Sequence, residues 1–218
     1  GFCLKKLVSS ALNSKVIFLL IMLTIHLPTE SVKMDFPRGL SNSDFEDLCL
    51  ANPDLAIERE ADGKITFMSP VSFNRADSEA EFIADLKIYA RKYGGRATSS
   101  AVGLTLPDSS VRLPDACYVS EEKLLHFSKA DLDHLAAIVP DFVVEVRSPS
   151  DSLKQLQAKM QDVWMANGVR LAWLVDVKNE KLWIYRQNGS IDLISDFQQK
   201  VSGEDVLPGF EFDLRFLG

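Results

Sequence analysis

The feature that most constrains the fold is a run of six residues, 171–176, that is apolar except for its last member, Asp176. A segment this short and this apolar is typical of a strand buried on both faces of a sheet. Residues 152–166, just before it, read as a helix, and Asn167-Gly168 is a common stop signal at a helix C-terminus. A buried strand directly after a helix indicates an α/β fold.

The rest of the chain supplies further elements of both kinds. An N-cap signal at residues 41–44 predicts a helix over 45–52, and the Ala61-Asp62-Gly63 turn predicts a hairpin of two strands, 56–59 and 64–68. The remaining elements are a helix over 75–93 and strands over 97–106, 115–119, 141–146 and 181–186. The last strand alternates in character, which predicts a more exposed, antiparallel position. The order of elements therefore predicts a mixed sheet flanked by helices, with an N-terminal hairpin and helix.

The helix over 75–93 has an approximate apolar stripe that we expect to face the sheet. Its members are Ala76, Ala80, Ile83, Leu86, Ile88 and Ala90. The chain has 218 residues and 46% of them are hydrophobic, which suits one domain with a substantial core.

The first thirty residues allow two interpretations. Lys5 and Lys6 precede an apolar run at 16–25, as in the basic and hydrophobic regions of a signal or anchor, but the run is shorter than the roughly 20 residues of a spanning helix. We favour the interpretation that the natural protein starts at Met22 and that the first 21 residues are upstream sequence or an artificial addition. Residues 23–27 would then form a short leading strand. We therefore assign residues 1–33 to a leader and 34–218 to a single domain, and membrane attachment is the weaker expectation.

Composition limits the classes of function. The net charge of −7 argues against a broad nucleic-acid-binding face, although a compact site can offset it locally. The histidines show no metal-ligand spacing, and no CxxC pair occurs, so we expect no zinc site. Sparse, odd-numbered cysteines fit a reducing compartment and predict a cytoplasmic location; they are Cys3, Cys49 and Cys117.

The residues that point to chemistry lie in two segments where Pro-Asp precedes an apolar strand. One contains Asp115; the other contains Asp141 and, four residues later, Glu145. Because strand side chains alternate, Asp141 and Glu145 project on the same face. Glu145 is flanked by valines, and a carboxylate there is costly to bury unless it is paired or binds a cation.

Two carboxylates on adjacent strands suit Mg²⁺ or Mn²⁺, which bind one or two carboxylates, several waters and phosphate oxygens. Asp115 and Glu145 are therefore candidate ligands for a cation that polarises a phosphate and activates water. A lysine on the following helix could stabilise the charge of the transition state. The alternative is structural: an aspartate that starts a strand and a glutamate on a sheet edge.

Taken together, these motifs resemble one known family. Three segments resemble the Uma-two family of endonucleases. They are Arg-x-Pro-Asp at 112–115, Pro-Asp-x-Val-Val-Glu-Val-x-Ser-Pro-Ser-Asp at 140–151, and Gly-Val-x-x-x-Trp-Leu-Val-Asp at 168–176. The resemblance extends from Met22 or Met34 to Gly218. It implies the restriction-endonuclease-like fold of the PD-(D/E)xK nucleases, with DNA as substrate, and a homodimer that cuts two strands.

The resemblance also implies roles for single residues. Asp115 matches the metal-binding aspartate, and Glu145 matches the acidic member of the (D/E)xK element. Arg147 stands where that element has lysine, so the usual spacing is broken, and Lys159 on the following helix is the matching lysine.

Four further residues are additional candidates at the site. Glu58 is a further acid, Asp141 a second ligand, Lys154 the backup lysine, and Arg147 the basic residue in the usual lysine position.

Two functional hypotheses follow. The first is an endonuclease that hydrolyses DNA phosphodiester bonds with Mg²⁺ or Mn²⁺. The second is a catalytically inactive protein that keeps the nuclease fold for binding or assembly. The acidic net charge and the broken spacing at Arg147 favour the second hypothesis.

Overall fold

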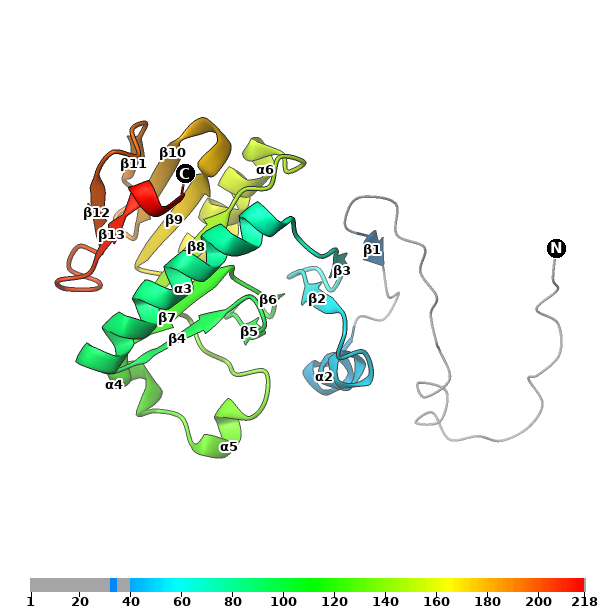
Figure 1. Ribbon diagram of the computed structural model, residues 1–218. Helices are drawn as coiled ribbons and strands as arrows, with labels where there is room; N and C mark the ends of the chain where they lie inside the picture. Colours follow the sequence, from blue (N-terminus) through cyan, green and yellow to red (C-terminus); the bar gives the residue numbers. More distant parts are fainter. Residues whose placement is uncertain (1–31, 35–39, 218) are drawn as a thin grey trace, which may run out of the picture.

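The computed structural model describes residues 32–34 and 40–217, and its centre is a six-stranded mixed sheet (Figure 1). The strand order is β11-β10-β9-β8-β7-β4. Only the central pair, β8 and β9, is parallel, and the other neighbours are antiparallel. The bounds are β4 (Arg96–Ser99), β7 (Ala116–Val119), β8 (Phe142–Val146), β9 (Leu171–Asp176), β10 (Lys181–Arg186) and β11 (Ile191–Ile194). Every residue of β9 is buried, as the sequence predicts.

Helix α3 (Phe73–Tyr93) covers one face of this sheet, together with the C-terminal part of the chain (Figure 1). Phe82 stacks on Phe212 with 4.1 Å between ring centroids and meets Trp173 edge-on. Such aromatic contacts add to the free energy of burial. The C-terminal elements are β12 (Lys200–Ser202), β13 (Glu211–Asp213) and η4 (Leu214–Leu217).

The opposite face is covered by the helix that follows β8, where Met160 and Trp164 are buried. We expected one helix over 152–166, but the segment has two parts. It begins as α6 (Leu153–Ala158) and continues as a π-helix, η2 (Lys159–Met165). The amide of Ala166 donates to the carbonyl of Gln161, five residues back. A π-helical turn inside a helix is rare and is frequent at functional sites. Three short helices lie in the connections between these elements: α4 (Glu121–Leu124), α5 (Lys129–Leu132) and η3 (Val177–Asn179).

A second sheet, order β1-β3-β2-β6-β5, packs with helix α2 (Asn42–Ala51) around a small core of its own. Its strands are β1 (Val32–Met34), β2 (Ala56–Arg59), β3 (Ile65–Met68), β5 (Leu104–Thr105) and β6 (Val111–Arg112). The predicted hairpin is confirmed as the antiparallel pair β2–β3. Strand β1 pairs with β3 and spans the junction between the expected leader and domain. The expected leading strand over 23–27 lies outside the described residues.

Three local predictions are wrong in whole or in part. Residues 97–106 form two strands in different sheets, because the chain turns after Ser99. The strand over 181–186 is antiparallel, as predicted, but it is mostly buried. Strand β11 forms the sheet edge instead, and the side chains of β10 pack in the cores on both faces of the sheet.

The face of α3 is predicted only in part. Leu86, Ile83 and Ala90 of the expected stripe pack in the core, whereas Ala76, Ala80 and Ile88 are exposed. Phe82 and Tyr89, which the stripe left out, are buried in their place. The larger aromatic side chains bury more apolar area and so decide which way the helix faces.

Within the part of the chain that the structure describes, no helix is both long enough and apolar enough to cross a bilayer. The apolar run at 16–25 lies outside that part.

Gly95 joins α3 to the sheet and provides a test of this packing. It has φ +81°, and a Cβ there would lie 2.5 Å from the Val119 carbonyl oxygen. Gly95→Ala should therefore lose about 1–3 kcal/mol more stability than Gly168→Ala. Gly168 also has a positive φ, +95°, but open space around it. Urea denaturation of both variants measures the difference, and equal losses would contradict the close approach of Gly95 to β7.

Candidate active site

Asp115 and Glu145 lie beside each other at one end of the central sheet. Strands β7 and β8 are antiparallel, and their last registered pair is Ala116↔Val144. Continuing the register by one residue puts Asp115 opposite Glu145. Both side chains are buried, with 6% and 4% of their surface exposed. The backbone amide of Val146, next to Glu145, donates to Asp115 Oδ2 at 2.7 Å. The sheet itself therefore brings together the two predicted acids.

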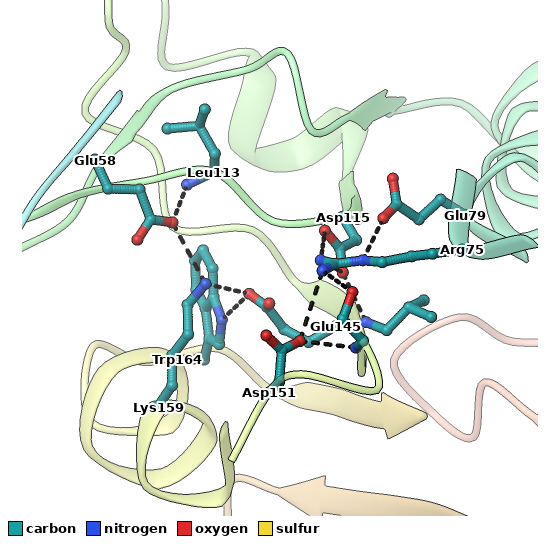
Figure 2. Close-up of polar contacts among 11 residues, drawn as sticks. Glu58, Arg75, Glu79, Leu113, Asp115, Glu145, Asp151, Lys159 and Trp164 are labelled. Carbon is teal, nitrogen blue, oxygen red and sulfur yellow. Dashed lines mark hydrogen bonds and ion pairs between the residues drawn. The ribbon is translucent and has the colours of Figure 1, made fainter. Parts of the chain in front are cut away.

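Lys159 reaches Glu145 from the π-helix. Its Nζ lies 2.9 Å from Glu145 Oε1, and Trp164 Nε1 donates to the same oxygen at 2.8 Å (Figure 2). Lys159 and Trp164 are five residues apart, and a π-helix forms its hydrogen bonds between residues five apart. The π-helical geometry thus lets one helix present an ammonium and an indole N–H to one carboxylate.

Glu58 enters from the second sheet. It lies on β2 between Ile57 and Arg59, which face the small core around α2, so alternation directs Glu58 the other way. Its Oε1 lies 3.3 Å from Lys159 Nζ and accepts from the Leu113 amide at 3.0 Å, as Figure 2 shows. Its other oxygen accepts from Arg112 at 3.0 Å.

Arg75 and Glu79, on the first turns of α3, complete the centre. The Arg75 guanidinium donates to both oxygens of Asp115, each at 3.0 Å, and to Glu79 Oε1 at 2.8 Å (Figure 2). It also contacts Ser148 Oγ at 2.9 Å and Asp151 Oδ2 at 3.6 Å. One nitrogen of Arg75, Nη2, thus spans both oxygens of Asp115, while Nε and Nη1 hold Glu79 and Ser148. Charge-assisted bonds of this kind are stronger than bonds between neutral groups.

Comparison with known proteins decides the family. The profile of the Uma2 family, described as "Putative restriction endonuclease", matches residues 43–215, which is most of the chain. The chain belongs to the Uma2 family. A crystal structure of a putative nuclease belonging to DUF820 from Anabaena variabilis is similar, with a TM-score of 0.66 and 16% identity over 82% of this chain and 97% of that chain. This likeness confirms the predicted fold. No curated protein matches.

In this Uma2 member, the pKa values of the two central acids are raised toward neutral pH. Burial raises the pKa of Glu145 to about 7; Lys159 opposes the rise, and Asp115 and Glu58 add to it. Burial also raises the pKa of Asp115 to about 6, although Arg75 opposes it. Both shifts mean that the surroundings stabilise the ionised form of these acids less well than water does.

Glu58 and Lys159 behave in the opposite way and stay charged. Burial alone raises the pKa of Glu58, but Lys159, Arg112 and the Leu113 amide outweigh it and hold the pKa below its usual range. Burial lowers the pKa of Lys159, but Glu145 and Glu58 outweigh it and hold the pKa above its usual range. The ammonium of Lys159 is therefore a permanent cation of the centre.

The centre fits a hard divalent cation in the kind of donors it offers, because Asp115 and Glu145 are carboxylates on neighbouring strands with raised pKa values. Within residues 32–34 and 40–217, no three acid, histidine or cysteine side chains already form a ready-made ligand group. In the structure, Arg75 contacts both oxygens of Asp115, and Lys159 contacts one oxygen of Glu145.

Three additional candidates lie away from this centre. Asp141 is four strand residues from Glu145, about 13 Å along the chain; it accepts from the Ser120 amide at 2.8 Å and pairs with Lys123 at 3.0 Å. Arg147 pairs with Asp176 rather than with the acids of the centre. Lys154 is exposed on α6.

Sequence reasoning missed Arg75, Glu79 and Trp164. The first two are four residues apart, a spacing typical of helical ion pairs, but the expected stripe of α3 faced elsewhere. Trp164 packs in the core and also donates to Glu145. In an α-helix, residues five apart do not share a face, so the spacing from Lys159 gave no signal.

Trp164 and Trp173 form a matched pair for testing the support of Glu145. Both are fully buried, but among the described residues Trp173 Nε1 has no hydrogen-bond partner, whereas Trp164 Nε1 donates to Glu145. Trp164→Phe should cost about 1–3 kcal/mol more than Trp173→Phe, because it leaves a buried carboxylate short of a donor. Urea denaturation at pH 8 measures both, and equal costs would contradict this role of Trp164.

The raised pKa of Glu145 predicts a pH dependence of stability. The pKa rises from 4.5 to about 7 on folding, so between these values the folded chain binds more protons than the unfolded chain. The free energy of unfolding must then fall as pH rises through this window. Glu145→Gln should flatten part of this fall, whereas the exposed Glu122→Gln should leave it unchanged. Denaturation series from pH 4.5 to 7.5 provide the slopes; a slope unaltered by Glu145→Gln would rule out the shift.

Proposed function

We propose that this protein is a metal-dependent endonuclease that hydrolyses DNA phosphodiester bonds. The observation that carries the proposal is the meeting of Asp115, Glu145 and Lys159 from a loop, a strand and a π-helix at one buried point. The description of the Uma2 family as restriction endonucleases supports the reaction and the substrate. Because a duplex has two strands to cut, a homodimer is the assembly that we expect.

Asp115 and Glu145 would hold the cation, Mg²⁺ or Mn²⁺. Trp164 and Lys159 both contact Oε1 of Glu145, so Oε2 is the oxygen best placed to serve as a ligand. When bound, such a cation polarises the scissile phosphate and lowers the pKa of an attacking water. The deprotonated acids are the binding form, and the raised pKa values mean that cation binding would release protons near neutral pH.

Lys159 is the residue that we assign to the substrate. Its ammonium stays protonated beside Glu145, so it can donate to a phosphate oxygen on which negative charge develops, or orient the attacking water. Glu58 is a positioning residue in this scheme: it accepts three hydrogen bonds, one of them from Lys159, and fixes where the ammonium lies. Trp164 positions Glu145 in the same manner.

A catalytically inactive protein that uses this fold for binding or assembly is the second candidate. One observation favours it. Asp115 is paired with Arg75, and Glu145 with Lys159, so each acid has a counter-charge from the chain itself without any bound cation. A chain of this kind could keep the centre as a structural ion-pair network.

Substitution of the three residues separates the two candidates. With Mn²⁺ or Mg²⁺, Asp115→Asn, Glu145→Gln and Lys159→Ala should each slow plasmid cleavage at least about 100-fold, because each removes a charge that acts in the transition state. Lys154→Ala, on the exposed side of α6, is the matched control and should cleave at nearly the wild-type rate.

Two outcomes would count against the catalytic proposal. Cleavage that persists in both Glu145→Gln and Lys159→Ala would remove the site. A wild-type chain that neither cleaves DNA nor binds Mn²⁺ in calorimetry would leave the inactive alternative.

A further inference from the structure

Arg75 is the side chain that most directly opposes cation binding at the proposed site. It is the third residue of α3, its amide donates to the N-cap side chain of Ser72, and only 18% of its side chain is exposed. Its two bonds to Asp115 and the amide of Val146 take three hydrogen-bonding positions of that carboxylate. A carboxylate offers about four such positions. A cation that coordinates Asp115 therefore competes with Arg75 for the same oxygens and is repelled by its charge.

The surroundings of Arg75 offer it a second set of partners. It lines a pocket of about 320 Å³ between the start of α3 and the end of β8. Two other basic side chains line this pocket, Arg147 and Lys178, and the polar side chains of Ser72, Asn74 and Ser78 complete its wall. The planar guanidinium binds phosphate through two parallel hydrogen bonds in the same way as it binds a carboxylate. A substrate phosphate in this pocket could therefore replace Asp115 as the partner of Arg75.

We propose that Arg75 is an exchangeable counter-cation: it neutralises Asp115 in the metal-free chain, leaves it when a divalent cation binds, and then binds a phosphate of the nucleic-acid strand in the adjoining pocket. The inference rests on the proposed function, since it needs a cation at Asp115. In this scheme Arg75 lowers the affinity of the site for the cation while no substrate is present, and it contacts the substrate once the cation is bound. Arg75 is not itself expected to bind the metal.

Calorimetric titration with Mn²⁺ alone tests the first half of the proposal without reference to activity. Arg75→Gln should bind Mn²⁺ at least about tenfold more tightly than the wild-type chain, because a charge-assisted pair no longer has to be broken. Arg75→Lys keeps the charge but has a single nitrogen, which cannot hold Glu79, Ser148 and Asp115 together, so its affinity should lie between them. Arg75→Gln with Asp115→Asn should lose the gain.

Arg147→Gln is the matched control for charge. It removes an arginine from the same pocket, but one that pairs with Asp176 rather than Asp115, so its effect on Mn²⁺ affinity should be much smaller. Circular dichroism of metal-free Arg75→Gln checks that it folds. If it does not, Arg75→Lys against the wild-type chain carries the comparison.

The outcomes distinguish this inference from the function on which it rests. Equal or weaker Mn²⁺ binding by a folded Arg75→Gln overturns the exchange but leaves the metal site of the proposed function intact. No Mn²⁺ binding by either chain overturns both. If Arg75→Gln and Arg147→Gln tighten Mn²⁺ binding equally, the loss of one positive charge explains the gain in affinity, and the specific role of Arg75 is overturned.

The second half is tested by the affinity for a short DNA duplex in the cleavage-impaired Lys159→Ala background, measured by fluorescence anisotropy. Mn²⁺ should tighten duplex binding there, and adding Arg75→Gln should remove most of that tightening, because the released guanidinium is missing. Equal tightening with and without Arg75 would overturn the phosphate contact.

Discussion

The ammonium of Lys159 connects the two sheets at a single buried point. It lies 2.9 Å from Glu145 on the central sheet and 3.3 Å from Glu58 on the second. Breaking a buried ion pair by removing one partner is strongly destabilising, because it leaves the other charge uncompensated. Glu58 in turn accepts from the Leu113 amide, two residues before Asp115. The position of the aspartate thus depends, through the backbone, on a lysine from another layer of the fold.

The centre combines two kinds of acid that differ in what surrounds them. At Glu58 the charges of Lys159 and Arg112 outweigh the effect of burial, and the acid stays ionised. At Glu145 and Asp115 burial and the neighbouring acids outweigh the cations, and the pKa values rise. Pairs of titratable groups with pKa values pushed apart are a recurring mark of sites that do chemistry. In this chain the division follows the architecture: the acid with the lowered pKa comes from the small sheet, and the two acids with raised pKa values lie at the end of the large sheet.

The sequence was sufficient for the features that depend on short-range pattern. The apolar run that became β9, the β2–β3 hairpin and the carboxylate among the valines of β8 are all local signals. The face of α3 was predictable only in part, because the bulk of Phe82 and Tyr89 outweighs Ala76, Ala80 and Ile88. That error concealed Arg75 and Glu79, because Arg75 pairs with the distant Asp115 and Glu79 pairs with Arg75.

The π-helical segment has a consequence for how this family can vary. A π-helical segment holds about one residue more per turn than an α-helix. Each residue of an α-helix turns the chain by about 100°. Five residues apart in an ordinary α-helix, Lys159 and Trp164 would point about 140° away from each other, and only one of them could reach Glu145. Relatives should therefore keep either this five-residue spacing with its π-helical turn or a four-residue spacing in an ordinary α-helix, where residues four apart share a face.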